Sequence, residues 1–391
     1  MSKSIDSKSN EFKVLHITNW YPTEQNPNGA IWIDRHINAL NLYSYNKVIH
    51  AEVVKGKYRF TSRREILGNQ YYGINAPTSK WFIKEILSSC LLFWILVFKV
   101  DRMQYNVINI HIAYPLCTYL FLFLRFIKLP IIFSEHWSAY HLNFGVKSSK
   151  KLGRIKRIFN NGIPVITVSK ALAKDLQNFV GDVVIKKYVV PNVVDTKNFV
   201  FESGPTKSSN FFMVSQWQRP KDPFTAIRAF ARLFKDHPES SLRIGGYGDQ
   251  VPQMLTLIKE LNLIENVSFI GRLSPEQVAM EMRLATALVH ISDYETFSVV
   301  CAEAICCGTP VIASKVGGVT EYLDDENSIL LEQSDIDTIS ATMAKMMFNI
   351  EIYNREQISI KAISQFNERH VGRQYLEVLK KVRSEKHFKI Q

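Results

Sequence analysis

The chain has 391 residues, of which 46% are hydrophobic and 21% charged, with a formal net charge of +12 at pH 7. These fractions are typical of globular proteins and exclude a largely disordered chain, and the length predicts two domains. The positive charge is concentrated in residues 1–200, which hold 27 Lys and Arg against 12 Asp and Glu. Such a basic half indicates an anionic partner (nucleic acid, an anionic membrane surface or a phosphorylated substrate) or a solvated lysine-rich surface.

Cysteine usage and the first residues indicate the compartment. No zinc-ligand or CxxC spacing occurs, and the cysteines fall in apolar helical patterns, which predicts reduced, buried thiols in a cytosolic protein; they are Cys90, Cys117, Cys301, Cys306 and Cys307. The first ten residues are polar and do not resemble a secretory signal.

Two apolar runs in the first half raise the question of membrane contact. Residues 86–98 are fewer than the ~18 that a spanning helix needs, and residues 116–133 are interrupted by charges and a proline. Both are therefore predicted to be buried helices. A contact with one face of a membrane stays open, because aromatic residues lie close to basic ones in both runs: Trp94, Phe121, Phe123 and Phe126.

Strand and helix patterns alternate along the first half. An apolar strand at 13–17 precedes a turn-rich segment that ends at Gly29 and a helical pattern at 31–43. The later patterns fall at 48–54, 80–99, 107–111, 116–127, 131–134, 164–169, 171–179 and 188–190. Alternation of this kind predicts a doubly wound parallel sheet.

A polar stretch at 202–210 reads as a linker, and a second alternation follows it. Its patterns fall at 211–214, 224–234, 241–244, 251–261, 267–270 and 275–283. We therefore expect an α/β class protein with two domains in series, residues 1–200 and 206–365. A final helical segment at 366–386 could pack on either domain.

The most informative pattern is a pair of acidic residues, Glu295 and Glu303, eight positions apart. Strand 287–291 and a polar turn precede a helix at 297–307, which Gly308 ends before the next strand begins at Pro310. Glu295 then lies at the mouth of the helix and Glu303 about two turns along it. One long polar ligand could touch both, with anionic groups near the free backbone N–H groups, and a nucleotide-sugar has this shape.

Three further segments could contact such a ligand. The turn at 245–248, which contains Gly246, resembles a phosphate-cradling loop, although a plain tight turn explains it equally well. Arg219 and Lys221 follow strand 211–214 and could neutralise a diphosphate at the carboxyl end of the sheet. The glycine pair at 317–318 could admit a ligand closely.

In the first half, Glu135, His136 and Trp137 follow a strand directly, so His136 could bond a sugar or assist proton transfer, although a structural histidine is the commoner case. Asp335 and Asp337 have the DxD spacing that holds a metal in some sugar transferases. Here they open a helix at 336–347, where N-terminal capping is the expected role.

Taken together, these segments resemble glycosyltransferase family 4, whose fold is GT-B. The family's E-x7-E motif matches Glu295 to Glu303 within ETFSVVCAEAICCGTPVIASKVGGVTEYL. VPNVVD, IGGYG and FIGR follow the family pattern in the second half, and NPNGAIWIDRHINAL, HIAYP, SEHWSAY and SKALAKDL follow it in the first. The match covers nearly the whole chain, and it implies two Rossmann-like domains that face a central cleft.

The resemblance also implies the roles of individual residues. Glu303 would bind the ribose hydroxyls, Glu295 the transferred sugar and Lys221 the diphosphate. The family positions for further donor contacts are Gly29, Gly246, Arg272, Phe297 and Ser298, and those for the acceptor side are Tyr114, Glu135, His136 and Trp137. Catalytic contributions are expected from His136, Lys221 and Glu295.

The family implies retention of anomeric configuration, no metal and no other cofactor, and a C-terminal helix that returns to the first domain. The expected partners are a nucleotide-sugar donor, with a UDP-sugar favoured over a GDP-sugar, and a saccharide or lipid-linked saccharide acceptor. One departure is Gln216, which stands where the family has a basic residue; Arg219 could supply the missing charge.

We therefore expect a retaining glycosyltransferase of surface polysaccharide or glycoconjugate biosynthesis, in the cytoplasm and possibly on the inner face of the cell membrane. Two alternatives stay open. The first is a non-enzymatic protein that binds a membrane or nucleic acid through its basic half; against it, no known nucleic-acid module occurs. The second is a GT-B sugar-nucleotide epimerase, which shares the fold but not the E-x7-E pattern.

Overall fold

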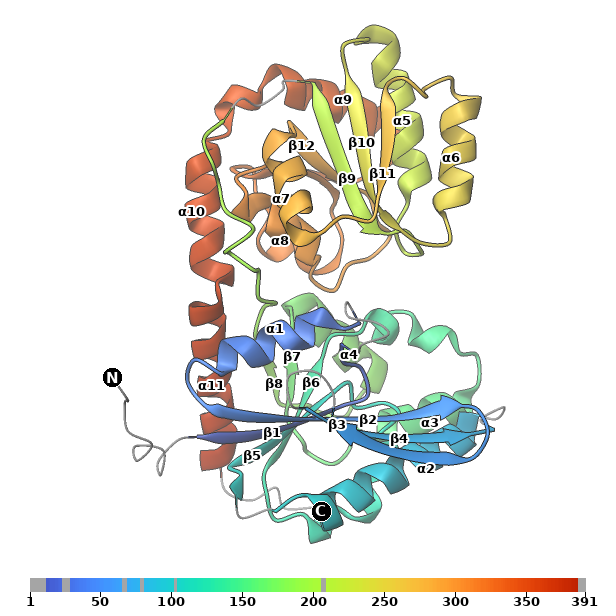
Figure 1. Cartoon of the computed structure of the whole chain (residues 1–391), viewed down its shortest axis with the longest axis vertical. Coiled ribbons are helices and arrows are strands. Elements are labelled where there is room, and N and C mark those ends of the chain that lie inside the picture. The colour runs from blue at the N-terminus through green and yellow to red at the C-terminus, as the bar shows by residue number, and fades with distance from the viewer. Residues whose placement is uncertain are drawn as a thin grey trace. The chain divides into compact units, whose positions relative to one another are not determined.

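The protein is described here by a computed structural model, which covers residues 12–22, 29–64, 69–77, 81–101, 104–204 and 209–385. It consists of two compact units (Figure 1): Met1–Asn192 together with Glu368–Gln391, and Val193–Asn367. Each unit has a largely parallel sheet with helices on both faces. The predicted pair of doubly wound α/β domains is therefore confirmed.

The units divide earlier in the sequence than the expected boundary near residue 200. Residues just after Asn192 bond within the second unit: Val194 donates its N–H to the Phe366 carbonyl at 2.9 Å, and Arg283 Nη1 donates to the Asn198 carbonyl at 3.3 Å. These bonds join residues 193–200 to helices of the second unit. The segment predicted to be a linker, residues 202–210, therefore lies within the second unit and not between the two units. Residues 205–208 lie outside the described part.

The first unit has an eight-stranded sheet in the order β3-β4-β2-β1-β5-β6-β7-β8. All neighbouring strands are parallel except β3 and β4. The central strands β5 and β6 are fully buried runs, as expected for strands covered on both faces. The strands are β1 Lys13–Thr18, β2 Tyr45–Lys55, β3 Arg59–Arg64, β4 Gln70–Ala76, β5 Val107–His111, β6 Ile131–Glu135, β7 Val165–Thr167 and β8 Lys187–Val189.

Five α-helices are described in this unit, α1 Ile31–Leu40, α2 Trp81–Trp94, α3 Ser149–Arg157, α4 Lys170–Val180 and α11 Glu368–Ser384. Helix α11, at the end of the described chain, packs against α1 (Figure 1). At their contact a Cβ on Gly372 would lie 2.3 Å from the Ala39 carbonyl oxygen, so only glycine permits this approach.

Helix α2 continues as a π-helical turn at Ile95–Lys99. An 18-residue window of the helix Trp81–Lys99 has a mean hydropathy of 1.8, and 39% of that window is buried; by length and composition the helix could cross a membrane. It packs on β2 and β4, and its Glu85 is fully buried. One face of this helix therefore belongs to the core, as predicted, while the other is exposed.

The helix predicted at 116–127 is wrong. The segment forms two short 3-10 turns, Leu120–Leu122 and Leu124–Phe126, whose N–H groups bond to the carbonyl three residues back, as in Phe123 to Leu120 at 3.0 Å. The sequence there is apolar on all sides, so its pattern carries no period that distinguishes a helix from irregular turns.

The second unit has a six-stranded parallel sheet in the order β11-β10-β9-β12-β13-β14. Numbered along the chain this is the order 3-2-1-4-5-6, in which the connections reverse direction between β9 and β12. Ligands bind beyond the carboxyl ends of the strands at such a reversal. The strands are β9 Asn210–Gln216, β10 Ser241–Tyr247, β11 Val267–Gly271, β12 Ala287–His290, β13 Val311–Ser314 and β14 Ser328–Leu331.

Capping residues set the helix starts in this unit. Asp222 accepts the Thr225 N–H before Pro223 opens α5, and Asp335 accepts the Thr338 N–H at the start of α9. The expected capping role of Asp335 is therefore confirmed. The helices are α5 Pro223–Asp236, α6 Val251–Glu260, α7 Pro275–Leu284, α8 Val299–Cys306, α9 Ile336–Phe348 and α10 Arg355–Phe366.

Candidate active site

The loops that follow β9 and β12 meet at the reversal point of the second sheet. Lys221 and Ser292 form a backbone bridge between them. Asp222 donates its N–H to the Ile291 carbonyl at 3.0 Å, and Asp293 donates to the Pro220 carbonyl at 2.9 Å. These bonds fix two segments, far apart in sequence, at one edge of the sheet.

The side chains of Lys221 and Glu295 form an ion pair at this junction. The same carboxylate oxygen, Glu295 Oε1, lies 2.7 Å from Nε2 of His290, the last residue of β12. Ser298 Oγ lies 3.2 Å from that ring nitrogen. The side chain of Glu295 is 8% exposed and that of Lys221 18%, so the pair is mostly removed from water.

This environment keeps Glu295 ionised. Burial alone would raise the pKa of its carboxyl, but the charge of Lys221 and the hydrogen bonds from His290 and Lys221 outweigh burial and lower the pKa to about 2. Burial, followed by the charge of Lys221, lowers the pKa of His290 below its ordinary value despite the opposing Glu295. A neutral His290 therefore donates its Nε2–H to the carboxylate near pH 7.

The start of helix α8 presents backbone N–H groups beside this pair. Its N-cap, Ser298, has φ 65°, in the left-handed region, and no side chain among the described residues caps the helix. The Tyr322 hydroxyl donates to the carbonyls of both Phe297 and Ser298 at 2.7 Å. The Tyr322 hydroxyl thus holds the turn that leads into the helix, and the first N–H groups of a helix are the ones that can bind an anion.

The glycine pair after β13 packs against the backbone of the same turn. Gly318 donates its N–H to the Glu295 carbonyl at 2.9 Å, and a Cβ on Gly317 would lie 1.9 Å from that oxygen. The group that approaches these glycines closely is therefore the backbone carbonyl of Glu295.

Glu303 lies on α8, between Ser298 and the helix end, and is 9% exposed. Phe297, also buried, packs its ring 5.0 Å from that of Tyr322. The structure thus places Glu295, Phe297, Ser298 and Glu303 on one turn and the helix that follows it.

The glycines at the end of β10 are required by neighbouring backbone. A Cβ on Gly246 would lie 1.9 Å from the Ser215 carbonyl oxygen, and one on Gly248 would lie 2.2 Å from that of Trp217. At this strand end the Arg272 guanidinium lies over the Tyr247 ring, 4.5 Å from its centroid. The turn is tight, and a cation on an aromatic ring borders it.

Gln216 and Arg219 are both exposed beyond the core of β9, on the strand end and loop that lead to Lys221. The structure therefore brings Gln216, Arg219 and Lys221 to one edge of the sheet.

In the first unit the candidate residues follow the carboxyl ends of the neighbouring strands β1, β5 and β6. Strand β1 neighbours β5, which neighbours β6, and Asn19 after β1 donates to the Tyr114 carbonyl at 3.4 Å. Gly29 lies in the turn before α1; residues 23–28 of its loop lie outside the described part. The rings of Trp20 and Trp137 are 5.0 Å apart.

Glu135 is fully buried at the end of β6, and its Oε1 accepts the Ala113 N–H at 2.8 Å. Burial raises the pKa of Glu135 to about 7, although the Ala113 N–H and the Tyr140 hydroxyl oppose the shift. Tyr114 is also buried, and its hydroxyl donates to Glu85, which accepts a charged hydrogen bond from Arg154 as well. The Tyr114 hydroxyl is therefore held in the interior.

His136 lies among other histidines. Its ring centroid is 5.4 Å from that of His36 and 5.8 Å from that of His111, and burial lowers the pKa of His136 well below its ordinary value. Both its ring nitrogens are buried without a hydrogen-bond partner among the described residues, although the Asn192 side chain lies near. A neutral imidazole with unbonded nitrogens can still accept or donate to a ligand hydroxyl.

Sequence reasoning missed three contributors to these edges. The sequence pattern places His290 only in a strand, although a histidine that ends an apolar strand at the sheet's reversal point is a usable signal. Tyr322 supports the start of α8, and Tyr375 on α11 bonds Asn109 at 2.8 Å and Ser134 at 2.6 Å. No local pattern marks either tyrosine. Among the described residues no group of three or more His, Cys, Asp or Glu side chains is placed to hold a metal ion.

Comparison with known proteins agrees with this architecture. Residues 56–198 match the family model "Glycosyltransferase Family 4", and residues 195–363 match "Glycosyl transferases group 1". Glycogen synthase of Mycobacterium tuberculosis is 24% identical over 186 residues, which are 47% of this chain and 45% of that protein. The matched segment thus spans about half the length of this curated relative.

Two solved structures share the fold over nearly all of the chain. Sucrose-phosphate synthase from Thermosynechococcus elongatus superposes with a TM-score of 0.72 at 18% identity, covering 95% of this chain and 99% of that one. Anabaena Alr3699/HepE in complex with UDP and glucose superposes with a TM-score of 0.71 at 16% identity, covering 95% and 100%. Since the two family models together extend over residues 56–363, this chain belongs to glycosyltransferase family 4 and has the GT-B fold.

Proposed function

We propose that the protein is a retaining glycosyltransferase that transfers a sugar from a nucleotide-sugar to a saccharide or lipid-linked saccharide acceptor. The observation that carries the proposal is the meeting of Lys221, Glu295 and the uncapped start of α8 at the reversal point of the second sheet. A cation and free N–H groups suit a diphosphate, and a carboxylate beside them suits sugar hydroxyls.

In this proposal the donor lies along the turn and helix at 293–306. The ribose hydroxyls donate to Glu303, the diphosphate receives hydrogen bonds from the first turn of α8 and from Lys221, and the sugar hydroxyls donate to Glu295. The low pKa of Glu295 supports an acceptor-only role for its carboxylate. The Lys221–Glu295 pair of the free protein would separate in part, since both groups gain ligand contacts.

The transfer step breaks the bond between the anomeric carbon and the diphosphate oxygen. Negative charge then grows on the diphosphate, where Lys221 and the α8 N–H groups stabilise it, and positive charge grows on the sugar. The acceptor hydroxyl oxygen bonds the anomeric carbon on the face that the diphosphate leaves, and its proton passes to the departing diphosphate oxygen. Configuration is thereby retained. No metal or other cofactor takes part in this scheme.

In the first unit, His136 and Glu135 are proposed to contact the sugar and acceptor. The unbonded ring nitrogens of His136 support this role. Trp137 and the Gly29 turn lie at the same edge of the sheet. We further propose a UDP-sugar as donor, supported by the UDP and glucose named for the HepE structure, and a cytoplasmic location.

A thermal-shift panel with UDP, GDP, ADP and CMP tests the donor proposal. A ligand that binds only the folded state raises the melting temperature by mass action, so UDP should give the largest rise. Failure of all four at millimolar concentration would contradict it. Proton NMR of a responding nucleotide-sugar then separates the alternatives: sugar release or transfer with the donor's anomeric configuration supports the proposal, and a changed sugar still bound to nucleotide indicates an epimerase.

A further inference from the structure

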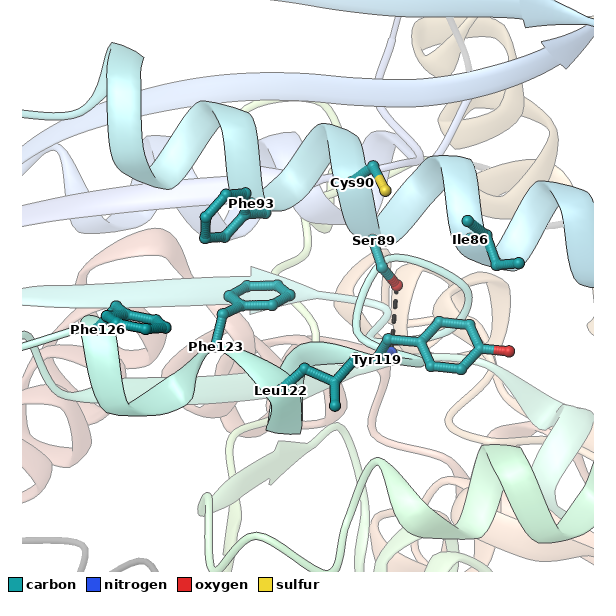
Figure 2. A pocket seen from close by; sticks show the side chains of 8 residues that line it. All are labelled: Ile86, Ser89, Cys90, Phe93, Tyr119, Leu122, Phe123 and Phe126. Atoms are coloured by element: carbon teal, nitrogen blue, oxygen red, sulfur yellow. Dashed lines mark hydrogen bonds between the residues drawn. The ribbon is translucent and has the colours of Figure 1, made fainter.

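The first unit contains a cavity in a place that the donor chemistry does not use. It lies between α2 and the 3-10 turns at 120–126 and has a volume of about 560 Å³ (Figure 2). On α2 the lining residues Ile86, Ser89, Cys90 and Phe93 recur at the spacing of one helix face. Ile86, Cys90 and Phe93 on this face are exposed, whereas Ser89 is buried, as are Leu91 and Leu92 on the neighbouring face.

The lining is almost entirely apolar. Phe93 packs edge to face on Phe123 at 5.1 Å across the cavity. The Ser89 hydroxyl accepts the Tyr119 N–H at 3.2 Å (Figure 2). It also donates to the Leu116 carbonyl at 3.1 Å, so both its donor and an acceptor position are used within the fold. The cavity therefore suits a ligand that needs no hydrogen bonds.

The apolar surface continues outward from the cavity. Leu122 is 60% exposed and Ile86 is 44% exposed, and Trp81, Phe82 and Phe98 on the same helix are also exposed. Large contiguous apolar areas on the surface of a globular protein mark sites of interaction with a protein, a membrane or a ligand.

Positive charges border this surface. Arg157, which is exposed, lies 5.7 Å from the centroid of the Phe121 ring, and the exposed Lys99 lies 4.9 Å from that of Trp94. Lys151 Nζ lies 3.3 Å from the centroid of the Trp81 ring but is buried. Residues 81–157 hold 11 Lys and Arg against 3 Asp and Glu, and two of those acids, Glu85 and Glu135, are fully buried. Aromatic rings paired with cations beside an apolar surface are the features of a membrane-interface site.

We propose that this cavity holds a hydrocarbon chain of an anionic lipid while the surrounding cations contact the lipid headgroups at a bilayer surface. A peptide occupant would bring backbone amides that the apolar lining could not satisfy. A second copy of the chain would bring its own cations against these, at an electrostatic cost. The proposal does not depend on sugar transfer, since the cavity and the donor residues lie in different units.

Cys90 gives a direct readout of occupancy. It lines the cavity and is exposed, whereas the four other cysteines are buried, and burial raises the pKa of each of those thiols. Iodoacetamide should therefore modify Cys90 selectively. The full chain would be mixed with vesicles of phosphatidylglycerol and phosphatidylcholine, with phosphatidylcholine vesicles alone, or with no lipid.

The expected result is flotation with the anionic vesicles only, together with a several-fold slower modification of Cys90. The double variant Ile86→Asp with Leu122→Asp should lose both effects, whereas Ile352→Asp with Ile360→Asp, exposed apolar positions of the second unit, should keep them. Matched melting temperatures would show that the variants fold. Glu303→Gln should float like the wild type even if nucleotide binding is lost.

Three outcomes would overturn the proposal. The protein fails to float with anionic vesicles; it floats while Cys90 reacts at its lipid-free rate, which would mean that charge alone binds the membrane; or Cys90 becomes protected without lipid as the protein concentration rises, which would mean that a second copy covers the cavity.

Discussion

The ammonium group of Lys221 and the carboxylate of Glu295 form an ion pair that joins the loops after β9 and β12. Seventy-four positions separate the two residues in the sequence, and the 3-2-1-4-5-6 strand order brings them together. His290 bonds the same carboxylate oxygen. The pair therefore connects the stability of the second unit with the donor site that we propose there.

Lys221→Met should destabilise the second unit. The substitution removes the cation and leaves the buried Glu295 carboxylate with His290, and breaking a buried pair in this way costs roughly 3 kcal/mol. Urea unfolding followed by circular dichroism measures the loss. Adding Glu295→Gln to Lys221→Met should recover part of it, because no unpaired charge then remains; a double variant as unstable as the sum of both single variants would contradict the pairing.

The pair also predicts the behaviour of the protein in acid. The folded pKa of Glu295, about 2, lies below its ordinary value of 4.5, so the stabilisation is complete above pH 4.5 and is lost as the pH falls toward 2. Between pH 6 and pH 3 the wild type should therefore lose more stability than Glu295→Gln. Parallel pH curves for the two proteins would show that the carboxylate is not stabilised by its neighbours.

Glu135 should give the opposite dependence of stability on pH. Burial raises the pKa of Glu135 from 4.5 to about 7, so the folded state is favoured below pH 4.5 and loses this contribution as the pH rises through 7. Glu135→Gln keeps an oxygen for the Ala113 N–H and cannot ionise. Relative to the wild type, the free energy of unfolding of Glu135→Gln should rise by up to about 3 kcal/mol between pH 4.5 and pH 8, as measured by unfolding at each pH. If the difference in free energy of unfolding between the two proteins did not change with pH, the proposed rise in the pKa of Glu135 would be contradicted.

Gly317→Ala should be strongly destabilising, by about 2 kcal/mol or more, because its φ of 52° disfavours a side chain and the new Cβ would meet the Glu295 carbonyl oxygen at 1.9 Å. Gly153→Ala is the matched control. No atom would lie within 4 Å of its Cβ, and in helix α3 alanine should stabilise by up to about 1 kcal/mol. Similar melting temperatures for both variants would contradict the packing of Gly317 on the Glu295 turn.

The sequence predicts most elements of the second unit, because its strands and amphipathic helices have clear periods and stop signals, although β14 and helix α10 were not predicted. Gly308, for example, ends the helix after Cys307 in the left-handed region that the pattern required, with φ 72°. The first unit was harder. The β3–β4 hairpin and helix α3 were not predicted, and residues 116–127 were assigned to a helix because uniformly apolar segments lack a distinguishing period.

The candidate site shows the same limit. The loop positions of Lys221 and Glu295 could be predicted, but their ion pair depends on strand order, which one sequence does not specify. The cysteines were all expected to be buried, which is wrong for Cys90, since it lies on the exposed face of α2. Because helix α2 is apolar on both faces, its sequence does not indicate which face packs on the sheet.

Titration calorimetry of UDP against the wild type, Glu303→Ala and Glu295→Gln tests the central claim most directly. We expect Glu303→Ala to weaken UDP binding by about 1.5–3 kcal/mol, roughly tenfold to a hundredfold, through the loss of hydrogen bonds to a charged group. Glu295→Gln should bind UDP nearly as the wild type does, because its proposed partner is the sugar, which UDP lacks. Equal losses in both variants, or UDP binding that survives Glu303→Ala unchanged, would contradict the donor site assigned to helix α8.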